Sequence, residues 1–304
     1  MLHRNPSLLA HLLLLAVVLI WGATFVLVKD ALTDASPLLF NLLRMTIAAG
    51  ALLALNRRQM RDLPRRTLAS GLFAGLFLAL GYQFQTSGLA KTTPAKSAFI
   101  TGMVVVFVPL LTAIPLFRPP TSRHLKWTDL LGASIAFSGL LLLTTPSGTK
   151  ASDLFGSMGP GDALTLLCAI AFAAHLLTLA HGAPNIPVRQ LATLQIAAAA
   201  LFMLITLPLG GPLYLHATPR LALALATTGL LATAAAFTIQ SWAQKHLPAS
   251  HTAVLLTLEP VFAWLTSFLI LHERLSHRSL VGALLIFIAI AIIELLPPTP
   301  VPIT

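Results

Sequence analysis

The sequence predicts an all-α membrane protein with ten transmembrane helices built from two inverted five-helix repeats. The first observation is composition: 57% of the 304 residues are hydrophobic and 9% are charged, whereas soluble domains are about 45–50% apolar and about 25% charged. The second is a series of apolar runs near the length of about 20 residues that spans a bilayer. The third is an internal repeat with an odd number of helices, which places its two copies in opposite senses across the membrane. Ten such spans use about 200 residues, so no soluble catalytic domain fits in the chain.

The first apolar run, residues 8–28, is longer than the apolar core of a secretory signal peptide, which has about 7–15 residues. It also lacks a small-residue cleavage site at its end, so we expect it to be retained as a transmembrane helix. Prolines lie at or near the ends of the runs, where they are tolerated. The predicted spans are residues 8–28, 36–55, 68–90, 95–117, 126–145, 162–181, 188–209, 219–243, 249–271 and 278–296.

The net charge of +10 comes from 19 Lys and Arg against 9 Asp and Glu. Because the basic residues lie in short loops, they indicate membrane orientation rather than nucleic-acid binding. With both termini cytoplasmic, the inner set is Arg4, Arg57, Arg58, Arg61, Arg65, Arg66, Arg118, Arg123, Lys126, Arg189 and Lys245. The smaller outer set is Lys29, Lys91, Lys96, Lys150, Arg220, Arg274 and Arg278. The bias reverses weakly in the second half, as expected for halves of opposite orientation.

The two halves also match each other directly. At offsets of 150–155 residues, Trp21 pairs with Phe172, Arg44 with Gln195, Tyr82 with Phe237, Gln85 with Gln240, Pro94 with Pro248 and Gly132 with Gly282. Chance similarity between apolar sequences is the alternative, and the matched Gln, Pro, Gly and aromatic positions argue against it. We expect a first repeat at 1–146, an outer linker at 147–160, a second repeat at 161–297 and a short tail at 298–304.

Glu259 is the one carboxylate near the middle of a predicted span. Its ionised form costs roughly 2.5 kcal/mol or more in a bilayer, so we expect it to face a cavity or a polar partner. It is a candidate for proton coupling, and the alternative is a polar staple bonded to backbone that Pro260 disturbs. Pro109 lies in the corresponding span of the first half, and proline-interrupted helices in both halves point to a binding site. We therefore predict helix breaks at Pro109 and Pro260.

Other polar and aromatic side chains inside the spans are candidate substrate ligands. Glutamines donate and accept hydrogen bonds, aromatic rings bind cations or stack, and a buried arginine can hold a carboxylate. The structural alternatives are interhelical bonds for the glutamines, packing for the aromatic rings, snorkelling for the arginine and a carbonyl-bonded core histidine. The predicted substrate-binding residues are Trp21, Thr24, Arg44, Tyr82, Gln85, Thr101, His175, Phe237 and Gln240.

Several short motifs resemble the EamA-type transporters of the drug/metabolite transporter superfamily over essentially the whole chain. They are Ile20-Trp21-Gly22, Leu43-Arg44, Gly81-Tyr82 with Gln85, Ala98-Phe99-Ile100-Thr101-Gly102, Phe107-Val108-Pro109-Leu110-Leu111, Leu258-Glu259-Pro260-Val261-Phe262 and Leu271-His272-Glu273-Arg274-Leu275. His272 stands where the family pattern usually has glycine. The resemblance implies ten helices, cytoplasmic termini and export of small metabolites, and it does not identify the substrate.

The leading hypothesis is a secondary active transporter in the cell inner membrane that exports an amino acid-like or drug-like metabolite by alternating access. Its expected partners are a small-molecule substrate, membrane lipid and protons, with no nucleic acid, cofactor or metal. An intramembrane enzyme is the first alternative, but no His-Glu-x-x-His, Gly-x-Ser-x-Gly or paired catalytic carboxylates occur. A channel or a non-transporting membrane subunit is the second alternative. The sequence leaves the oligomeric state open, and a monomer is compatible with it.

Overall fold

The computed structural model describes residues 6–119, 127–144, 158–247, 249–256 and 258–295. Residues 147–157 of the predicted linker and the predicted tail, 298–304, lie outside this part of the chain. Within it, regular structure is helical apart from one isolated antiparallel bridge between Ala35 and Leu215. The α-helices are α1 (Pro6–Ala31), α2 (Pro37–Asn56), α3 (Arg65–Leu89), α4 (Pro94–Thr101), α5 (Val104–Leu111), α6 (Trp127–Thr144), α7 (Pro160–Gly182), α8 (Val188–Thr206), α9 (Pro219–Ala226), α10 (Ala236–Ala243), α11 (Ala249–Leu256), α12 (Glu259–Leu271) and α13 (His277–Leu295).

The helices fit a multi-pass membrane protein. In the described residues, seven segments are long and apolar enough to cross a bilayer, α4 and α5 counting as one and α9 through α10 as one. Three shorter apolar segments, within α6, α12 and α13, add to these. Proline occupies the first turn of many helices, where its missing N–H costs nothing.

Two of the predicted spans are divided into shorter helices. The segment 95–117 becomes α4, α5 and a short 3₁₀ turn at Pro115–Phe117, with the division at Gly102 and Met103. Pro109 lies inside α5, which ends two residues later. The segment 249–271 becomes α11 and α12, so Glu259 begins a helix instead of lying at the middle of one. Pro260 accounts for this start, because it cannot donate to the preceding turn.

The helical segment that leads to Phe237 and Gln240 contains π-helical turns, which are wider than α-helical turns. Between α9 and α10, residues Thr227–Ala235 form a π-helix, labelled η5. π-helical turns are rare and frequently lie at functional sites.

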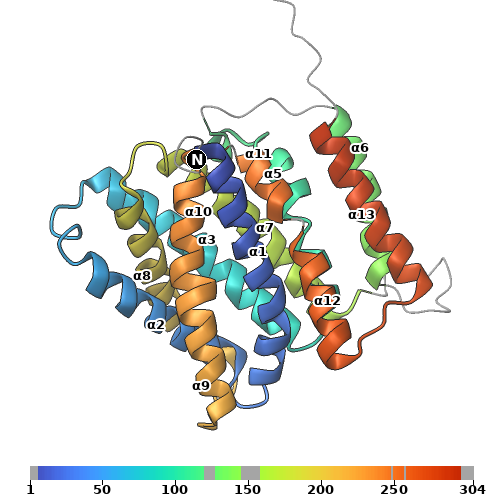
Figure 1. Ribbon diagram of the computed structural model, residues 1–304, viewed down its shortest axis with the longest axis horizontal. Coiled ribbons are helices and arrows are strands. Elements are labelled where there is room, and N and C mark those ends of the chain that lie inside the picture. Colours follow the sequence, from blue (N-terminus) through green and yellow to red (C-terminus); the bar gives the residue numbers. More distant parts are fainter. Residues whose placement is uncertain (1–5, 120–126, 145–157, 248, 257, 296–304) are drawn as a thin grey trace, which may run out of the picture.

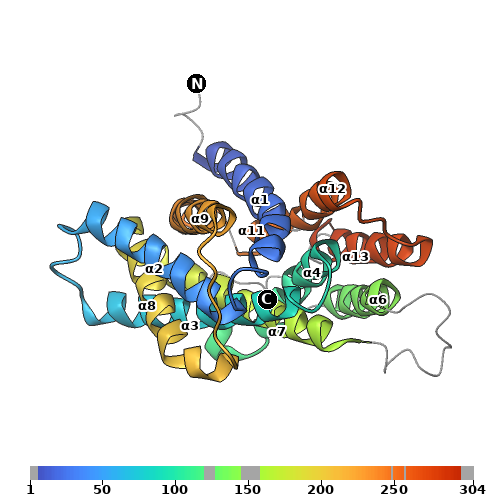
Figure 2. The same ribbon diagram turned by 90° about the horizontal axis from the view of Figure 1, so that it is seen from below.

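The helices pack as two flanking groups around a central set (Figures 1 and 2). α6 and α13 lie side by side at one edge, and α2 and α8 lie near the other. α3 packs on α7 and α8, while α1 crosses over the assembly against α12 and α10. α4 packs on α12 and α5 packs on α11. The divided segments of the two halves therefore meet at the centre.

Small residues permit these close crossings. A Cβ on Gly75 of α3 would lie 2.4 Å from Ala198 Cβ and 2.7 Å from Gln195 O of α8. A Cβ on Gly22 of α1 would lie 2.9 Å from Glu259 O. Helices approach this closely in membranes where small residues remove side-chain bulk. Gly22 consequently brings α1 against the beginning of α12.

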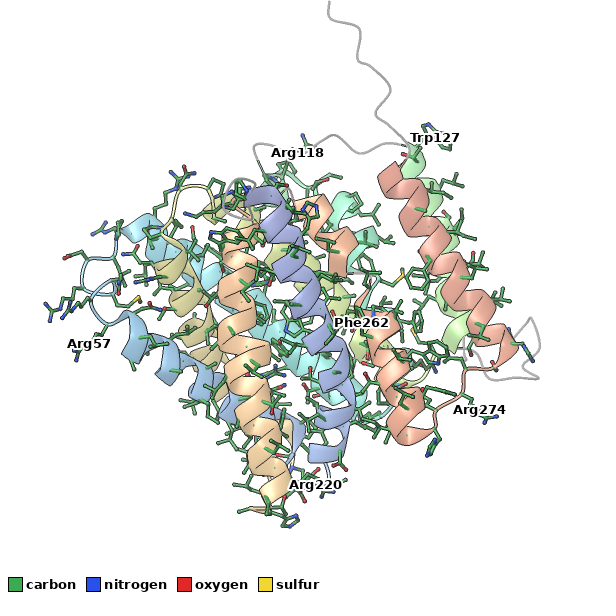
Figure 3. All side chains as sticks on the ribbon, in the orientation of Figure 1. Arg57, Arg118, Trp127, Arg220, Phe262 and Arg274 are labelled. Atoms are coloured by element: carbon green, nitrogen blue, oxygen red, sulfur yellow. The ribbon has the colours of Figure 1, made fainter. Side chains whose placement is uncertain are left out.

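Charged loops lie at both ends of the bundle. Arg118 and Trp127 lie at one end and Arg220 and Arg274 at the other (Figure 3). At the Arg220 end, the Arg220 guanidinium donates from Nε to Asp34 Oδ2 and from Nη2 to Asp34 Oδ1, both at 2.9 Å. Thr218 Oγ1 donates to Asp34 Oδ2 at 2.7 Å. These contacts join the loop after α1 to the start of α9.

We predict a pH-dependent contribution of Asp34 to stability. Hydrogen bonds from Arg220 and Thr218 hold the pKa of the Asp34 carboxyl below its ordinary value. A lowered folded-state pKa gives stability that is present above the unfolded pKa and is lost as pH falls through the folded pKa. Asp34→Asn should therefore lower the melting temperature in detergent at neutral pH, and the difference from wild type should shrink as the pH falls below about 4.

Asp30→Asn is the matched control, because Asp30 is 48% exposed and meets Arg220 at 3.2 Å. Exposed ion pairs contribute little, so its effect at neutral pH should be smaller. An Asp34→Asn difference that stays constant from neutral to acidic pH would contradict this account.

The start of α4 is held by a residue from the second half. Glu273 accepts hydrogen bonds from Thr93 Oγ1 and Ser267 Oγ, and from Ala95 N at 3.4 Å. A carboxylate at a helix N-terminus also complements the helix dipole. The preceding residue, His272, has φ of 53° in the left-handed region, a conformation that favours glycine. The backbone thus gives a physical reason for the glycine usual in the family pattern.

Candidate functional site

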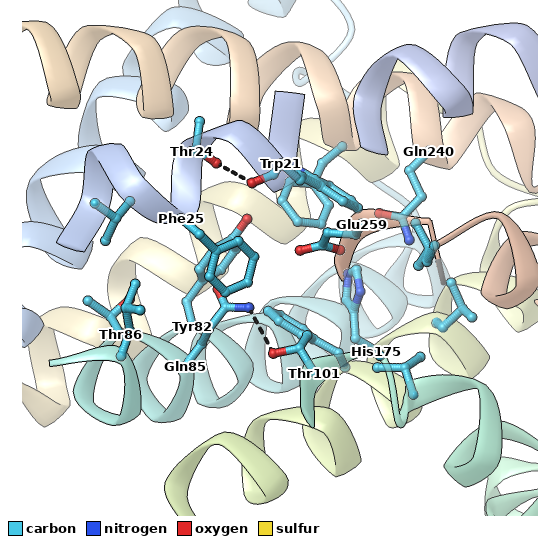
Figure 4. Close-up of a pocket in the computed structure, with 18 of the residues that line it drawn as sticks. Trp21, Thr24, Phe25, Tyr82, Gln85, Thr86, Thr101, His175, Gln240 and Glu259 are labelled. Atoms are coloured by element: carbon cyan, nitrogen blue, oxygen red, sulfur yellow. Dashed lines mark hydrogen bonds between the residues drawn. The ribbon is translucent and has the colours of Figure 1, made fainter. Parts of the chain in front are cut away.

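A pocket lies where α1, α2, α3 and the divided segments meet α7 and α10 (Figure 4). The structure brings all nine predicted substrate-binding residues and Glu259 into its lining. Neither Pro109 nor Pro260 lines it. The remaining lining residues are Phe25, Val28, Thr86, Leu89, Gly102, Val104, Phe172, Leu176, Ala253 and Leu256. Substrate binding by this pocket stays a prediction.

Three of the lining residues that sequence reasoning missed had usable signals. Phe25 lies four residues after Trp21, which places it on the same helix face. Thr86 adjoins Gln85. Phe172 is the repeat partner of Trp21 and stacks edge-on against Tyr82, with ring centroids 5.3 Å apart. The internal repeat would therefore have indicated Phe172 as a further lining residue.

Phe237 is the centre of an aromatic cluster in the pocket. Its ring centroid lies 5.2 Å from that of Trp21, 5.6 Å from that of His175 and 6.0 Å from that of Tyr82. Tilted and edge-on ring pairs at such distances are favourable. The cluster fixes the rings, so the pocket has a preformed aromatic wall.

Arg44 carries a buried positive charge in the lining, with 3% of the residue exposed. Its guanidinium donates to Thr233 Oγ1 from Nη2 at 3.0 Å and from Nε at 3.3 Å. It also lies over the Tyr82 ring, 4.3 Å from the centroid. No carboxylate pairs with it among the described residues. The Arg44 charge is therefore stabilised by the Thr233 hydroxyl and the face of the Tyr82 ring, and no carboxylate of the described residues neutralises it.

The π-helix η5 supplies partners for two pocket residues. Thr233, which holds Arg44, lies in η5. Ala232, also in η5, offers its carbonyl oxygen to Trp21 Nε1 at 2.7 Å. Trp21 and Arg44 come from the first half of the chain, so η5 orients side chains across the two halves.

His175 is held by a directed chain of hydrogen bonds. Gln195 Nε2 donates to Ser241 Oγ at 2.9 Å, and Ser241 Oγ donates to Phe237 O at 2.7 Å. This amide orientation leaves Gln195 Oε1 as the acceptor of a 2.8 Å bond from His175 Nε2. The neutral imidazole therefore carries its proton on Nε2, and Nδ1 is left as an acceptor. The partner is a side-chain amide rather than the helix carbonyl that the structural alternative predicted.

Glu259 lines the pocket as the first residue of α12 and is 9% exposed. Its side chain has no hydrogen-bond or salt-bridge partner among the described residues. The N-terminal end of α12 is a favourable place for its negative charge. The polar-staple alternative requires a bonded carboxylate, which the described contacts of Glu259 do not include.

The two glutamines that the repeat pairs have different surroundings. Gln85 Nε2 donates to Thr101 Oγ1 at 3.4 Å. Gln240 is 2% exposed, and its Oε1 has no partner in the described structure. An unbonded buried amide oxygen is costly, and a ligand that donated a hydrogen bond to Gln240 Oε1 would remove this cost.

Apolar helices around a pocket with polar and aromatic side chains in its lining fit a membrane transporter. The chain belongs to the EamA-like transporter family, whose model matches residues 8–145 and 159–295. The resemblance noted in the sequence is thereby confirmed, and the family supports a transporter role rather than an enzymatic one.

Individual relatives agree with this assignment. A protein of Archaeoglobus fulgidus named "uncharacterized transporter" is 33% identical over 95% of this chain and 86% of its own. The Bacillus subtilis "uncharacterized transporter YoaV" is 24% identical over 90% of this chain and 92% of its own. A solved crystal structure of a protein with 22% identity superposes with a TM-score of 0.66, covering 94% of this chain and 96% of that one. This last likeness shows the fold.

Proposed function

We propose that the protein is a proton-coupled secondary transporter that exports a small metabolite by alternating access. The observation that carries the proposal is the unpaired Glu259 carboxylate in a central pocket where divided helices of both halves meet. Substrate sites of secondary transporters lie near the bilayer midplane between repeats and are built from interrupted helices. A carboxylate without a partner can take up and release a proton without breaking an internal bond.

The divided segments support two related halves. The first piece of each, α4 and α11, has eight residues. Gly102, just after α4, faces Pro260 of α12, and a Cβ there would lie 3.1 Å from Pro260 Cγ. Such crossed, interrupted helices in both halves are typical of inverted repeats.

The proposal includes ten spans in two inverted repeats of 1–146 and 161–297. α4 with α5, α9 through α10 and α11 with α12 each count as one span. The separate family matches at 8–145 and 159–295 support these units. The excess of Lys and Arg in the inner loops supports cytoplasmic termini, and placement in the cell inner membrane rests on the family resemblance. Export, as opposed to uptake, rests on the family resemblance.

We predict that cells making the protein accumulate at least one small metabolite in their medium. Metabolite profiling of the medium should compare them with cells making Glu259→Gln at the same membrane level. The identified compound should then cross proteoliposome membranes when a pH gradient is imposed. Identical media from both cultures and from cells lacking the protein, together with no gradient-driven flux of candidate metabolites, would refute the transporter proposal. Ion conductance without coupling would indicate a channel instead.

A further inference from the structure

One side of the pocket presents hydrogen-bond acceptors without protein donors. Glu259 contributes a carboxylate with no partner among the described residues, and Gln240 contributes an unbonded Oε1. His175 contributes Nδ1, which is an acceptor because Nε2 donates to Gln195 Oε1. Figure 4 shows these three side chains on the same side of the pocket.

The chemistry of these groups defines their ligand. Buried acceptors without donors cost free energy until a ligand supplies N–H or O–H groups. A carboxylate among them favours a cation, and the rings of Trp21 and Phe237 in the same lining can add cation–π attraction. A primary ammonium carries one positive charge and three N–H donors, which matches three acceptors and an aromatic wall.

We infer that Glu259, Gln240 and His175 form a subsite for a protonated amine that carries N–H donors. The subsite rests on the proposed transport function and specifies its substrate class. A quaternary ammonium would keep the charge and the ring contacts but could not satisfy the acceptors. The subsite therefore selects N–H-bearing ammonium groups over fully alkylated ones.

Two classes of ligand carry such an ammonium group, and they differ in whether they also carry a negative charge. A simple amine has only the ammonium, whereas an α-amino acid adds a carboxylate. Arg44 lines the same pocket without a carboxylate partner in the described chain, and it could hold that second group. The ammonium subsite is common to both sources.

Binding to the purified full-length protein in lipid nanodiscs tests the inference without requiring transport. Isothermal titration calorimetry at neutral pH should compare benzylamine with benzyltrimethylammonium, which lacks N–H donors. Benzylamine should bind at least about tenfold more tightly. Equal binding, tighter binding of the trimethyl compound, or no binding of either would overturn the assignment.

Phenylglycine, which is benzylamine with an added α-carboxylate, distinguishes the sources. Tighter binding than benzylamine identifies an amino acid, and an Arg44→Gln variant should then lose the gain. Weaker binding identifies a simple amine. Both results support the subsite, provided that benzylamine binds more tightly than benzyltrimethylammonium.

Gln240→Leu tests the subsite within the protein. Because Gln240 Oε1 has no internal partner, this variant should fold, with an unchanged melting temperature, yet bind benzylamine about tenfold more weakly. Gln83→Leu is the matched control: Gln83 bonds Thr206 at 2.6 Å and does not line the pocket. Equal amine affinities in the two variants would overturn the role of Gln240.

Failure of the subsite and failure of the transport proposal give different results. If amines do not bind but another metabolite is moved by a pH gradient, the subsite is wrong and the transporter stands. If benzylamine binds with the expected selectivity and no substrate is moved, the subsite stands and the transport proposal fails.

Discussion

Glu259→Gln should abolish transport driven by a pH gradient while the protein still reaches the membrane. Glutamine has the shape of glutamate but takes up no proton in this range, so a step that needs protonation of residue 259 stops. The described contacts of Glu259 include no hydrogen bond or ion pair that the substitution would break. Flux into proteoliposomes with an imposed pH gradient should fall to the level of vesicles without protein.

A carboxylate outside the pocket provides the control. Asp62 lies exposed in the loop between α2 and α3, so Asp62→Asn should transport like wild type. Membrane levels and melting temperatures should be measured for both variants. Undiminished gradient-driven flux in Glu259→Gln would remove this residue from the coupling mechanism.

Gly75→Ala should destabilise the protein by about 1–3 kcal/mol, the usual cost of overpacking a close contact. The added methyl would lie 2.4 Å from Ala198 Cβ, 2.7 Å from Gln195 O and 2.9 Å from Ala199 N. Two of these are backbone atoms, so relief requires α8 to move away from α3. The measurement is the melting temperature in detergent, with the fraction of monodisperse protein after extraction.

Gly50→Ala is the paired control in α2. A Cβ there meets nothing within 4 Å, and alanine has a helix propensity better than that of glycine by about 1 kcal/mol. This variant should be as stable as wild type or more stable. Equal melting temperatures for the two alanine variants would show that α3 and α8 are not in such close contact.

The pocket lining could be predicted because polar groups are expensive in a bilayer. Arg44, Gln85, Gln240 and Glu259 are conspicuous inside apolar runs, and such residues face a cavity or a partner. The structure places them in one pocket, while their function stays a prediction. Phe172, one of 16 phenylalanines, has no such contrast with its neighbours.

Partners and helix breaks depended on three-dimensional geometry. The sequence could not show that His175 bonds Gln195 of the next helix, because this depends on how α7 and α8 are rotated against each other. It could not show that Arg44 bonds Thr233 either, because these residues lie far apart in the chain. Pro260 correctly marks the first turn of α12. In the first half the division falls at Gly102 and Met103, although Pro109 had seemed the stronger signal. Pro109 lies only two residues before the end of α5, so it does not divide this helix.

The wide turns of η5 make the pocket sensitive to chain length. A π-turn accommodates more residues than an α-turn, so its register sets the direction of every side chain that follows it. Each residue of an α-helix turns the chain by about 100°. Deleting one residue from Thr227–Ala235 would rotate Phe237 and Gln240 by about that angle and turn them away from the pocket, unless a π-turn absorbed the deletion by becoming an α-turn. The number of residues in this stretch, and not only their identity, is part of what encodes the binding surface.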